Sequence, residues 1–335
     1  MAKIEPYVMA MCRPQTRTVF DAEGRVQREV LDANVDHYCE VIARAAAEHQ
    51  ARIIAFPQFA LTGYTPLGGP GWAEASVTFP GPEMDRIAEA AKAANAYVIV
   101  QVSERHDAFP GRYFLSAAVL TPEGEVGIVY RKNYAMSLRT SPIDVYDRFI
   151  ETFGNDAFFP VLDTPLGTIG LAIGAEVHWP EAIRALALKG AEIVINPIAA
   201  APLIDYLKRP GAQVVRGVRA FENTVYLGMA NIAGEGPRSE IYDYDGGVIG
   251  AQVDDGMFTL AQIDIEALRR ARTSPAANFL AQLQPAIHEP VDELPLWPRN
   301  AFPDAPPSGA EQLIATERDA WARLQALGRG KAPSE

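Results

Sequence analysis

Residues 168–181 read TIGLAIGAEVHWPE, and this stretch predicts the local structure around which the rest of the chain is organised. An apolar run ends at Gly174, a short turn follows, and a helix is expected from Pro180, because proline is tolerated in the first turn of a helix. A strand, a tight turn and a helix in this order can present a nucleophilic side chain at the edge of a sheet. The residue at the tip is a glycine, which has no side chain to present.

Strand and helix patterns alternate on both sides of this stretch, which favours an α/β fold with two sheets covered by helices. The turn sequence at 121–124 also predicts that the strands on either side of it form a hairpin. We expect strands at 5–12, 52–56, 97–103, 113–120, 125–131, 168–174, 192–196, 225–231, 239–244, 248–251 and 257–264. We expect helices at 33–49, 82–95, 180–189, 210–222, 264–271 and 309–328.

The stretch at 168–190 resembles the nucleophile motif of the nitrilase superfamily, the carbon–nitrogen hydrolases. That motif has a cysteine after an apolar strand, then an aromatic residue, an acidic residue, and Pro-Glu at the start of a helix. Gly174 stands in the place of the cysteine, and Ala175 in the place of the aromatic residue. The positions that fit the motif are Glu176, Pro180, Glu181, Arg184 and Gly190.

Further motifs of the same superfamily occur before and after this stretch, in the expected order. Residues 53–58, IIAFPQ, and 61–64, LTGY, resemble the motif of the catalytic glutamate, with Gln58 in its place. Tyr130-Arg131-Lys132 resembles the motif of the catalytic lysine, and Lys132 is retained. Residues 219–223, RAFEN, resemble a later helix. The resemblance implies a four-layer α-β-β-α sandwich at 1–272 and a C-terminal extension at 273–335 that docks on a partner subunit, in a homodimer or larger homo-oligomer.

The resemblance also implies a chemistry that this chain cannot perform in the usual way. In the superfamily a cysteine thiol attacks an amide or nitrile carbon, a glutamate is its base, and a lysine stabilises the oxyanion. Gln58 has the shape of glutamate but accepts no proton at neutral pH, and Gly174 has no sulfur. We therefore consider three functions: a repurposed enzyme of lyase, isomerase or hydratase type; a non-catalytic pseudoenzyme that binds a small ligand or a protein; and residual hydrolysis by directly activated water.

Lys132 is the centre of the first hypothesis. Burial without a neighbouring acid lowers the pKa of a lysine, which would make Lys132 a base or a Schiff-base nucleophile. Pairing with Glu176 would instead leave an ammonium that binds an anionic substrate, and the sequence leaves both possibilities open. The candidate catalytic residues are Lys132, Glu176 and His178, although Glu176 and His178 are also typical structural residues. The triad-equivalent positions are Gln58 and Gly174, and the candidate substrate-binding residues are Tyr64, Tyr134, Ala175 and Trp179.

The composition narrows the range of partners. The net charge of the 335-residue chain is −12 and no basic run occurs, which argues against nucleic acid or an anionic membrane as partner. No run approaches the length of a membrane-spanning helix, and no N-terminal signal segment is evident, so a cytoplasmic location is expected. Cys12 and Cys39 are expected to be small buried side chains. Histidines and cysteines have no zinc-site spacing, so we expect no metal and no cofactor.

Overall fold

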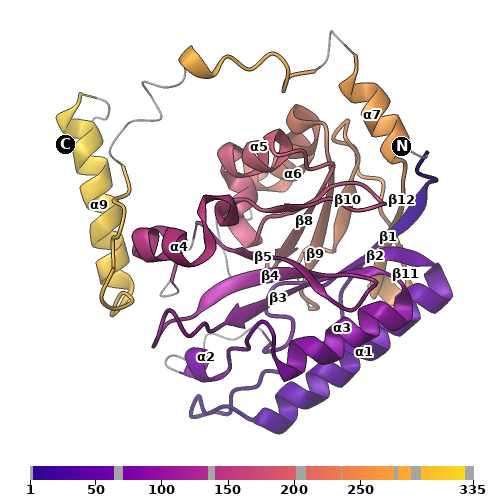
Figure 1. Ribbon diagram of the computed structural model, residues 1–335, viewed down its shortest axis with the longest axis horizontal. Helices are drawn as coiled ribbons and strands as arrows, with labels where there is room; N and C mark the ends of the chain where they lie inside the picture. Colours follow the sequence, from indigo (N-terminus) through magenta and orange to yellow (C-terminus); the bar gives the residue numbers. More distant parts are fainter. Residues whose placement is uncertain are drawn as a thin grey trace.

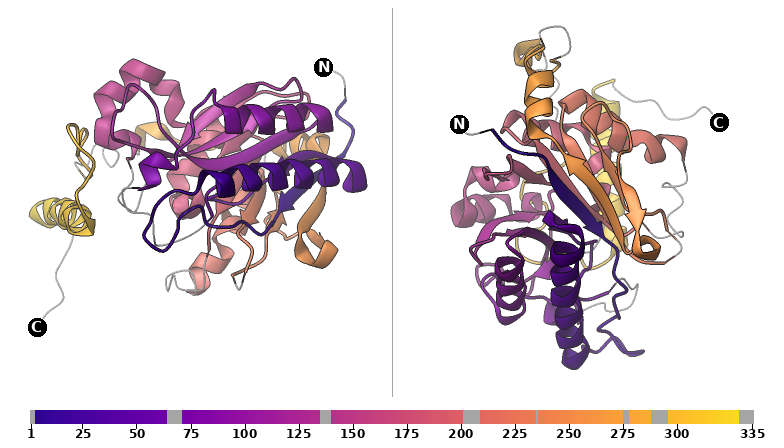
Figure 2. Two further views of the ribbon diagram at one scale, coloured as in Figure 1. Left: turned by 90° about the horizontal axis from the view of Figure 1, so that it is seen from below. Right: turned by 90° about the vertical axis from the view of Figure 1, so that its right-hand side faces the viewer.

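The computed structural model describes residues 3–63, 71–134, 140–200, 209–234, 236–274, 278–287 and 296–328. Two β-sheets pack face to face, and helices cover the outer face of each sheet (Figure 1). The two further views in Figure 2 show the same order of layers from the side. The four-layer α-β-β-α sandwich expected from the sequence is therefore confirmed.

The first sheet has seven strands, and its central strands are parallel. The order across the sheet is β11 (Ala251–Val253), β12 (Phe258–Ile263), β1 (Tyr7–Cys12), β2 (Ala51–Ala55), β3 (Tyr97–Glu104), β4 (Phe114–Leu120) and β5 (Val126–Arg131). Strands β1, β2 and β3 run parallel, whereas the other neighbours are antiparallel. Helices α1 (Arg28–His49) and α3 (Pro82–Ala94) pack on the outer face through one apolar cluster.

The second sheet has five strands in the order β10 (Glu240–Tyr242), β9 (Tyr226–Asn231), β8 (Ile193–Ile198), β7 (Ile169–Leu171) and β6 (Val161–Leu162). Strands β7, β8 and β9 are parallel. Helices α5 (Pro180–Leu188) and α6 (Pro210–Asn223) lie on its outer face, where Ile183 and Leu186 pack against Val194 of β8. Gln58 and Gly174 come after the carboxyl ends of the parallel strands β2 and β7, and Lys132 comes after β5, which runs in the same direction as β3.

A second buried cluster lies between the two sheets. Met9 and Met11 of β1 meet Ile193 and Ile195 of β8 in one buried cluster. Gly228 of β9 lets the sheets approach closely, because a Cβ atom at this position would lie 2.8 Å from Sδ of Met11. Apolar side chains on the inner faces of the buried strands account for this packing.

Most predicted elements are present with shifted ends, and a few were wrong or missed. The hairpin of β4 and β5 is confirmed, and its turn contains Gly124 with φ +83°. Helix α1 begins five residues earlier than predicted, and the strand predicted at 248–251 is instead formed by Ala251–Val253. Helix α4 (Tyr146–Phe153) was not predicted, because it has only eight residues and is held by aromatic contacts from distant segments. Cys12 is buried and Cys39 half-buried, and both are free thiols.

Part of the C-terminal extension packs on its own chain. The backbone N–H groups of Asn300 and Phe302 donate to the carbonyl oxygens of Ile143 and Asp144 at 2.9 and 3.2 Å. The Arg112 guanidinium donates to the carbonyl oxygen of Phe302 at 2.6 Å, and the Phe302 side chain is buried. Helix α9 (Ala310–Ala326) has no buried residue and stands apart from both sheets (Figure 1). Docking of the extension on a partner subunit stays a prediction.

Candidate active site

The turn at Gly174 joins β7 to α5 and has the conformation that a glycine favours. Strand β7 ends at Leu171, the 3-10 helix η3 (Gly174–His178) follows, and α5 begins at Pro180. Gly174 has φ +60°, in the left-handed region that residues with a Cβ atom rarely adopt. The strand, turn and helix expected from the sequence are therefore present, with a glycine at the tip.

Three triad-equivalent positions from distant parts of the chain meet at this turn. A Cβ atom on Gly174 would lie 2.8 Å from Oε1 of Gln58 and 3.4 Å from Nζ of Lys132. Gln58 follows β2, and Lys132 follows β5, where its N–H donates to the carbonyl oxygen of Leu115 at 2.8 Å. Both side chains are 6% exposed. The pocket therefore keeps a buried lysine beside a position that has no side chain.

Glu176 connects the Gly174 turn to the segment that carries Lys132. Its carboxylate is fully buried. Oε2 accepts a hydrogen bond from the backbone N–H of Ile173 at 2.6 Å. Oε1 accepts from three donors: the Tyr130 hydroxyl at 2.6 Å and the backbone N–H groups of Asn133 at 2.8 Å and Tyr134 at 3.1 Å. Four donors occupy the acceptor positions of this carboxylate, which favours the structural role over proton transfer.

The electrostatics of Glu176 and Lys132 are linked. Burial raises the pKa of Glu176, whereas the positive charge of Lys132 and the hydrogen bond from Tyr130 oppose that rise. The same attraction stabilises the charged form of Lys132. Burial of Lys132 acts against this charge, so the ammonium form of Lys132 stays a prediction. The Tyr130 hydroxyl keeps its proton, because burial and Glu176 raise its pKa well above the usual value.

Asn196 and Arg216 support the turn from behind, and Asn196 was not among the residues that the sequence singled out. The Asn196 amide donates to the carbonyl oxygens of Ala172 at 2.7 Å and Gly174 at 3.1 Å. Its Oδ1 accepts from Nε of Arg216 on α6 at 3.1 Å. Asn196 is fully buried within the apolar strand β8, and a polar residue inside such a strand was the signal that could have identified it.

The second arginine of α6 holds the far end of the turn. Nε of Arg219 donates to the carbonyl oxygen of Val177 at 2.9 Å, and its guanidinium pairs with Glu222 at 2.9 Å. His178 is half-buried, and burial together with Arg216 and Arg219 lowers its pKa. His178 is therefore neutral at neutral pH, and the charged groups that act on it belong to α6.

The candidate substrate-binding residues are only partly brought together. The rings of Tyr134 and Trp179 stack with centroids 4.9 Å apart, beside the segments that carry Lys132 and Gly174. Ala175 is half-buried in the turn itself. Tyr64 lies outside the described residues. The stacked pair thus links the segment after Lys132 to the end of the turn that begins at Gly174.

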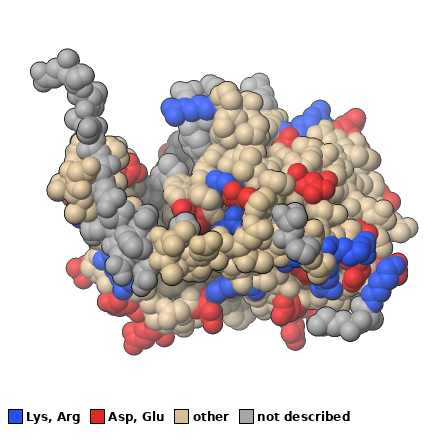
Figure 3. All heavy atoms as spheres, turned by 90° about the horizontal axis from the view of Figure 1, so that it is seen from above, with Lys and Arg blue, Asp and Glu red and all other residues tan. Residues whose placement is uncertain are grey.

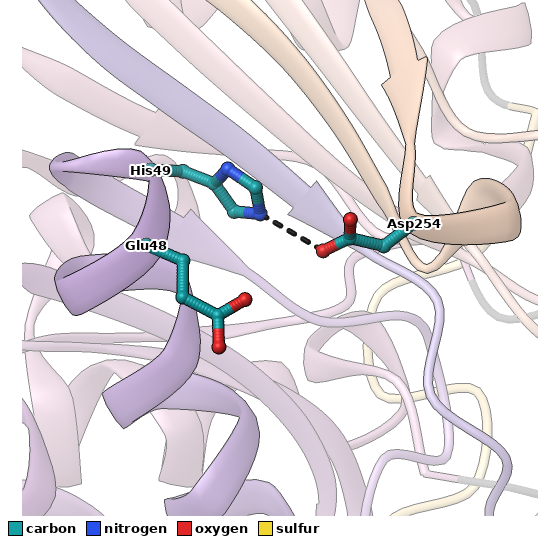
Figure 4. Close-up of side chains that lie close together, drawn as sticks. All are labelled: Glu48, His49 and Asp254. Carbon is teal, nitrogen blue, oxygen red and sulfur yellow. Dashed lines mark hydrogen bonds and ion pairs between the residues drawn. The ribbon is translucent and has the colours of Figure 1, made fainter.

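A second group of titratable residues lies at the end of α1 (Figure 4). Ligand atoms of Glu48, His49 and Asp254 are within 4.8 Å of one another, and Nε2 of His49 lies 3.0 Å from Oδ2 of Asp254. The Arg44 guanidinium contacts both carboxylates, at 3.4 Å for Glu48 and 3.3 Å for Asp254. Arg44 offsets one of the two negative charges and occupies an oxygen of each carboxylate, so we assign no metal site to this exposed cluster.

The molecular surface agrees with the composition. Acidic and basic side chains are interspersed on the described part of the face drawn in Figure 3, and no broad basic patch covers it. Among the described residues, no helix has the length and apolar character needed to cross a membrane.

Comparisons with known proteins place these features in a family. The family model for carbon-nitrogen hydrolases matches residues 22–273. An (R)-stereoselective amidase of a Pseudomonas species is 25% identical over 246 residues, which cover 71% of this chain and 82% of that protein. An omega-amidase of Xenopus tropicalis is 25% identical over 251 residues, 72% of this chain and 87% of the relative.

Solved structures show the same fold. One is a double mutant of the amidase from Nesterenkonia sp. AN1, with a glutamate changed to glutamine and a cysteine to alanine, in complex with acrylamide. It matches with a TM-score of 0.62 and 20% identity, over 85% of this chain and 97% of that chain. A single mutant of the same amidase, in which only the cysteine is changed to alanine, is described as a member of the nitrilase superfamily and matches with the same TM-score.

Proposed function

This chain belongs to the carbon-nitrogen hydrolase family, and from that premise we propose that it acts on a small molecule through a reaction that needs no thiol nucleophile. The observation that carries the proposal is the position of Lys132, whose Nζ lies 3.4 Å from the place of the missing Cβ atom of Gly174. A buried lysine is costly to maintain, and its retention at the family position supports a role in chemistry.

The proposed role of Lys132 follows from its charge. An ammonium beside Glu176 donates hydrogen bonds and stabilises negative charge that develops on a carbonyl oxygen. Such stabilisation assists proton removal next to a carbonyl, addition of water or elimination, which are lyase, isomerase or hydratase steps. The neutral imidazole of His178 is the candidate group that accepts the proton. Gly174 carries no sulfur that would compete with such a reaction, and the stacked rings of Tyr134 and Trp179 come from the segments that follow Lys132 and Gly174.

The test compares Lys132→Met with the wild type. We expect wild-type protein to convert at least one member of a panel of small carbonyl compounds, followed by proton NMR, and K132M to lose that turnover by about a hundredfold or more. Lys189→Met is the matched control, because Lys189 is a partly exposed lysine paired with Asp156 at 2.9 Å. Equal turnover by K132M and wild type would exclude a lysine-centred reaction.

A second candidate function is binding without turnover. It is favoured by Gln58, and by the similar structure in which a glutamine and an alanine replace glutamate and cysteine and acrylamide is bound. If acrylamide is included in the panel of compounds, this function predicts that it binds saturably and that no product forms. Release of ammonia from the amide would instead support hydrolysis by directly activated water.

We also propose a homo-oligomer that buries the exposed face of α6. Val214, Val218 and Phe221 are 60%, 45% and 49% exposed, at a spacing that places them on one face of the helix. The charged residues of this helix, Arg216 and Arg219 among them, are buried or half-buried. An apolar face without charge on an outer helix is typical of a protein interface.

The assembly proposal predicts a change of mass in solution. The double variant Val218→Glu, Phe221→Glu is expected to shift the protein to a smaller species in size-exclusion chromatography with light scattering, because buried charges without partners oppose association. Val248→Glu is the control, since Val248 is 58% exposed on a different segment. A wild-type protein that is already monomeric would refute the proposal.

A further inference from the structure

We propose that a segment of the C-terminal extension positions Lys132 from within the same chain. This segment, residues 299–303, forms a strap across the place where the chain rejoins the first sheet after Lys132. The positioning residues are Asn300 and Phe302 of the strap, together with Arg112 before β4. The inference rests on the proposed function for the role of Lys132, and it adds the residues that hold Lys132 in place.

The first argument is the position of Lys132 at the end of a strand pair. Its N–H group, one residue after β5, donates to the carbonyl oxygen of Leu115 on β4 at 2.8 Å. Thr140 forms a β-bridge with Phe114 on the same edge of β4, because β3 occupies the other edge. The Thr140 N–H group donates to the carbonyl oxygen of Tyr113 at 3.2 Å. The start of β4 therefore holds both Lys132 and the point where the chain comes back beside it.

The second argument is that the strap is bonded to the chain directly after this point. The N–H group of Asn300 donates to the carbonyl oxygen of Ile143 at 2.9 Å. The N–H group of Phe302 donates to the carbonyl oxygen of Asp144 at 3.2 Å. The Asn300 side chain donates to Oδ2 of Asp147 at 2.8 Å and accepts from the Asp147 N–H group at 3.1 Å. These hydrogen bonds join the strap to the start of α4 and to the turn before it.

The third argument is the buried guanidinium of Arg112, which binds the strap from the side of β4. Arg112 directly precedes Tyr113 and is 4% exposed. Its Nη2 donates to the carbonyl oxygens of Phe302 at 2.6 Å and Pro303 at 3.1 Å. A buried cation that loses its hydrogen-bond acceptors is costly, so the strap and the start of β4 stabilise each other. The strap thus bonds to both segments between which the chain returns.

The contrast with helix α9 shows that the docking belongs to the strap and not to the whole extension. Helix α9 follows the strap, has no buried residue and stands apart from both sheets (Figure 1). Its aromatic residue Trp321 is 49% exposed, whereas the Phe302 side chain is buried. Each of the two segments therefore offers one aromatic side chain for a matched pair of variants.

Phe302→Ala tests the inference in the full-length protein, with Trp321→Ala as the matched control. Hydrogen exchange with mass spectrometry measures the opening of residues 140–147, and acetylation by acetic anhydride, mapped by mass spectrometry, measures access to the Lys132 amine. We expect both rates to rise on the order of tenfold or more in F302A, because loss of a buried aromatic ring weakens the docking. Exchange in β8 and acetylation of Lys189 are expected to keep their wild-type rates, and W321A is expected to change none of these rates.

A milder pair of variants changes one contact of the strap without removing a buried side chain. Asn300→Asp places a second carboxylate beside Asp147, and we expect it to raise the same two rates about threefold, since this contact is partly exposed. Combining it with Asp147→Asn reverses the two roles, because the new amide donates to the new carboxylate. We expect wild-type rates in this combined variant, a rescue that a general loss of stability would not give.

Each outcome supports or overturns the inference. Wild-type rates in F302A would overturn it, and so would faster exchange at 140–147 with unchanged acetylation of Lys132, because the strap would then hold only α4 and the turn before it. If exchange in β8 rises equally in F302A, the milder variants decide, and a combined variant that is not rescued overturns the inference. None of these measurements needs a substrate, so they stand even where the carbonyl panel shows no turnover and the proposed function fails.

Discussion

Amide hydrolysis is expected to return when Gln58→Glu and Gly174→Cys are combined in one chain. The side chains that such chemistry needs lie close by, because Nζ of Lys132 is 3.4 Å from the Cβ position at 174. Oε1 of residue 58 is only 2.8 Å from that position, so the end of this flexible side chain must shift slightly when a Cβ atom is added. A thiol there would have a carboxylate as base and an ammonium to stabilise the oxyanion. Since the members of a catalytic triad act as a unit, each single variant is expected to stay inactive.

The measurement is ammonia release from butyramide, with an expected rate for the double variant at least about a hundredfold above either single variant. Fluoroacetamide labelling followed by mass spectrometry gives a second measure, because an activated thiol at 174 reacts while the buried Cys12 does not. Burial raises the pKa of both native thiols, so the native background is low. The left-handed φ of +60° adds a strain of about 1–3 kcal/mol to any residue with a Cβ atom.

A double variant that is labelled by fluoroacetamide but does not hydrolyse butyramide would separate the reactivity of the thiol from the fit of the substrate. It would show that the thiol is accessible and reactive, and that the rest of the pocket has been rebuilt for another ligand. A double variant that folds, as judged by circular dichroism, and reacts with neither compound would contradict the view that only residues 58 and 174 block hydrolysis.

The three triad-equivalent positions could be placed from the sequence, because each lies within three residues of the end of a strand that has a recognisable motif. Gln58, Lys132 and Gly174 follow β2, β5 and β7, and the fold brings them to one place. Asn196 was not predictable as a support, since its hydrogen bonds join strands β7 and β8 and depend on their register.

The other elements that were missed also depend on tertiary contacts. Helix α4 packs in an aromatic cluster with residues from other segments. Its residue Asp147 also accepts a hydrogen bond from Asn300, which lies 153 positions further along the chain. No local pattern records such a contact. The roles of Glu176 were left open by the sequence for the same reason, because three of its four donors lie more than 40 residues away.

The second large effect is expected for Glu176→Gln, a change that keeps shape and removes charge. Three of the four groups around the carboxylate are backbone N–H groups, which only donate hydrogen bonds. The NH2 group of a glutamine would face at least one of these donors, so a buried hydrogen bond is lost and Lys132 loses its neighbouring charge. We expect the free energy of unfolding to fall by about 3–5 kcal/mol, the usual loss when one partner of a buried charged pair is removed.

Chemical denaturation of E176Q and of Glu181→Gln measures this effect. Glu181 is an exposed glutamate in the first turn of α5, so its change is expected to cost less than about 1 kcal/mol. A protonated, uncharged Glu176 would behave differently, because glutamine mimics a protonated carboxyl group and E176Q would then be close to wild type in stability. The size of this one difference therefore reports the charge of Glu176, on which the proposed ammonium form of Lys132 depends.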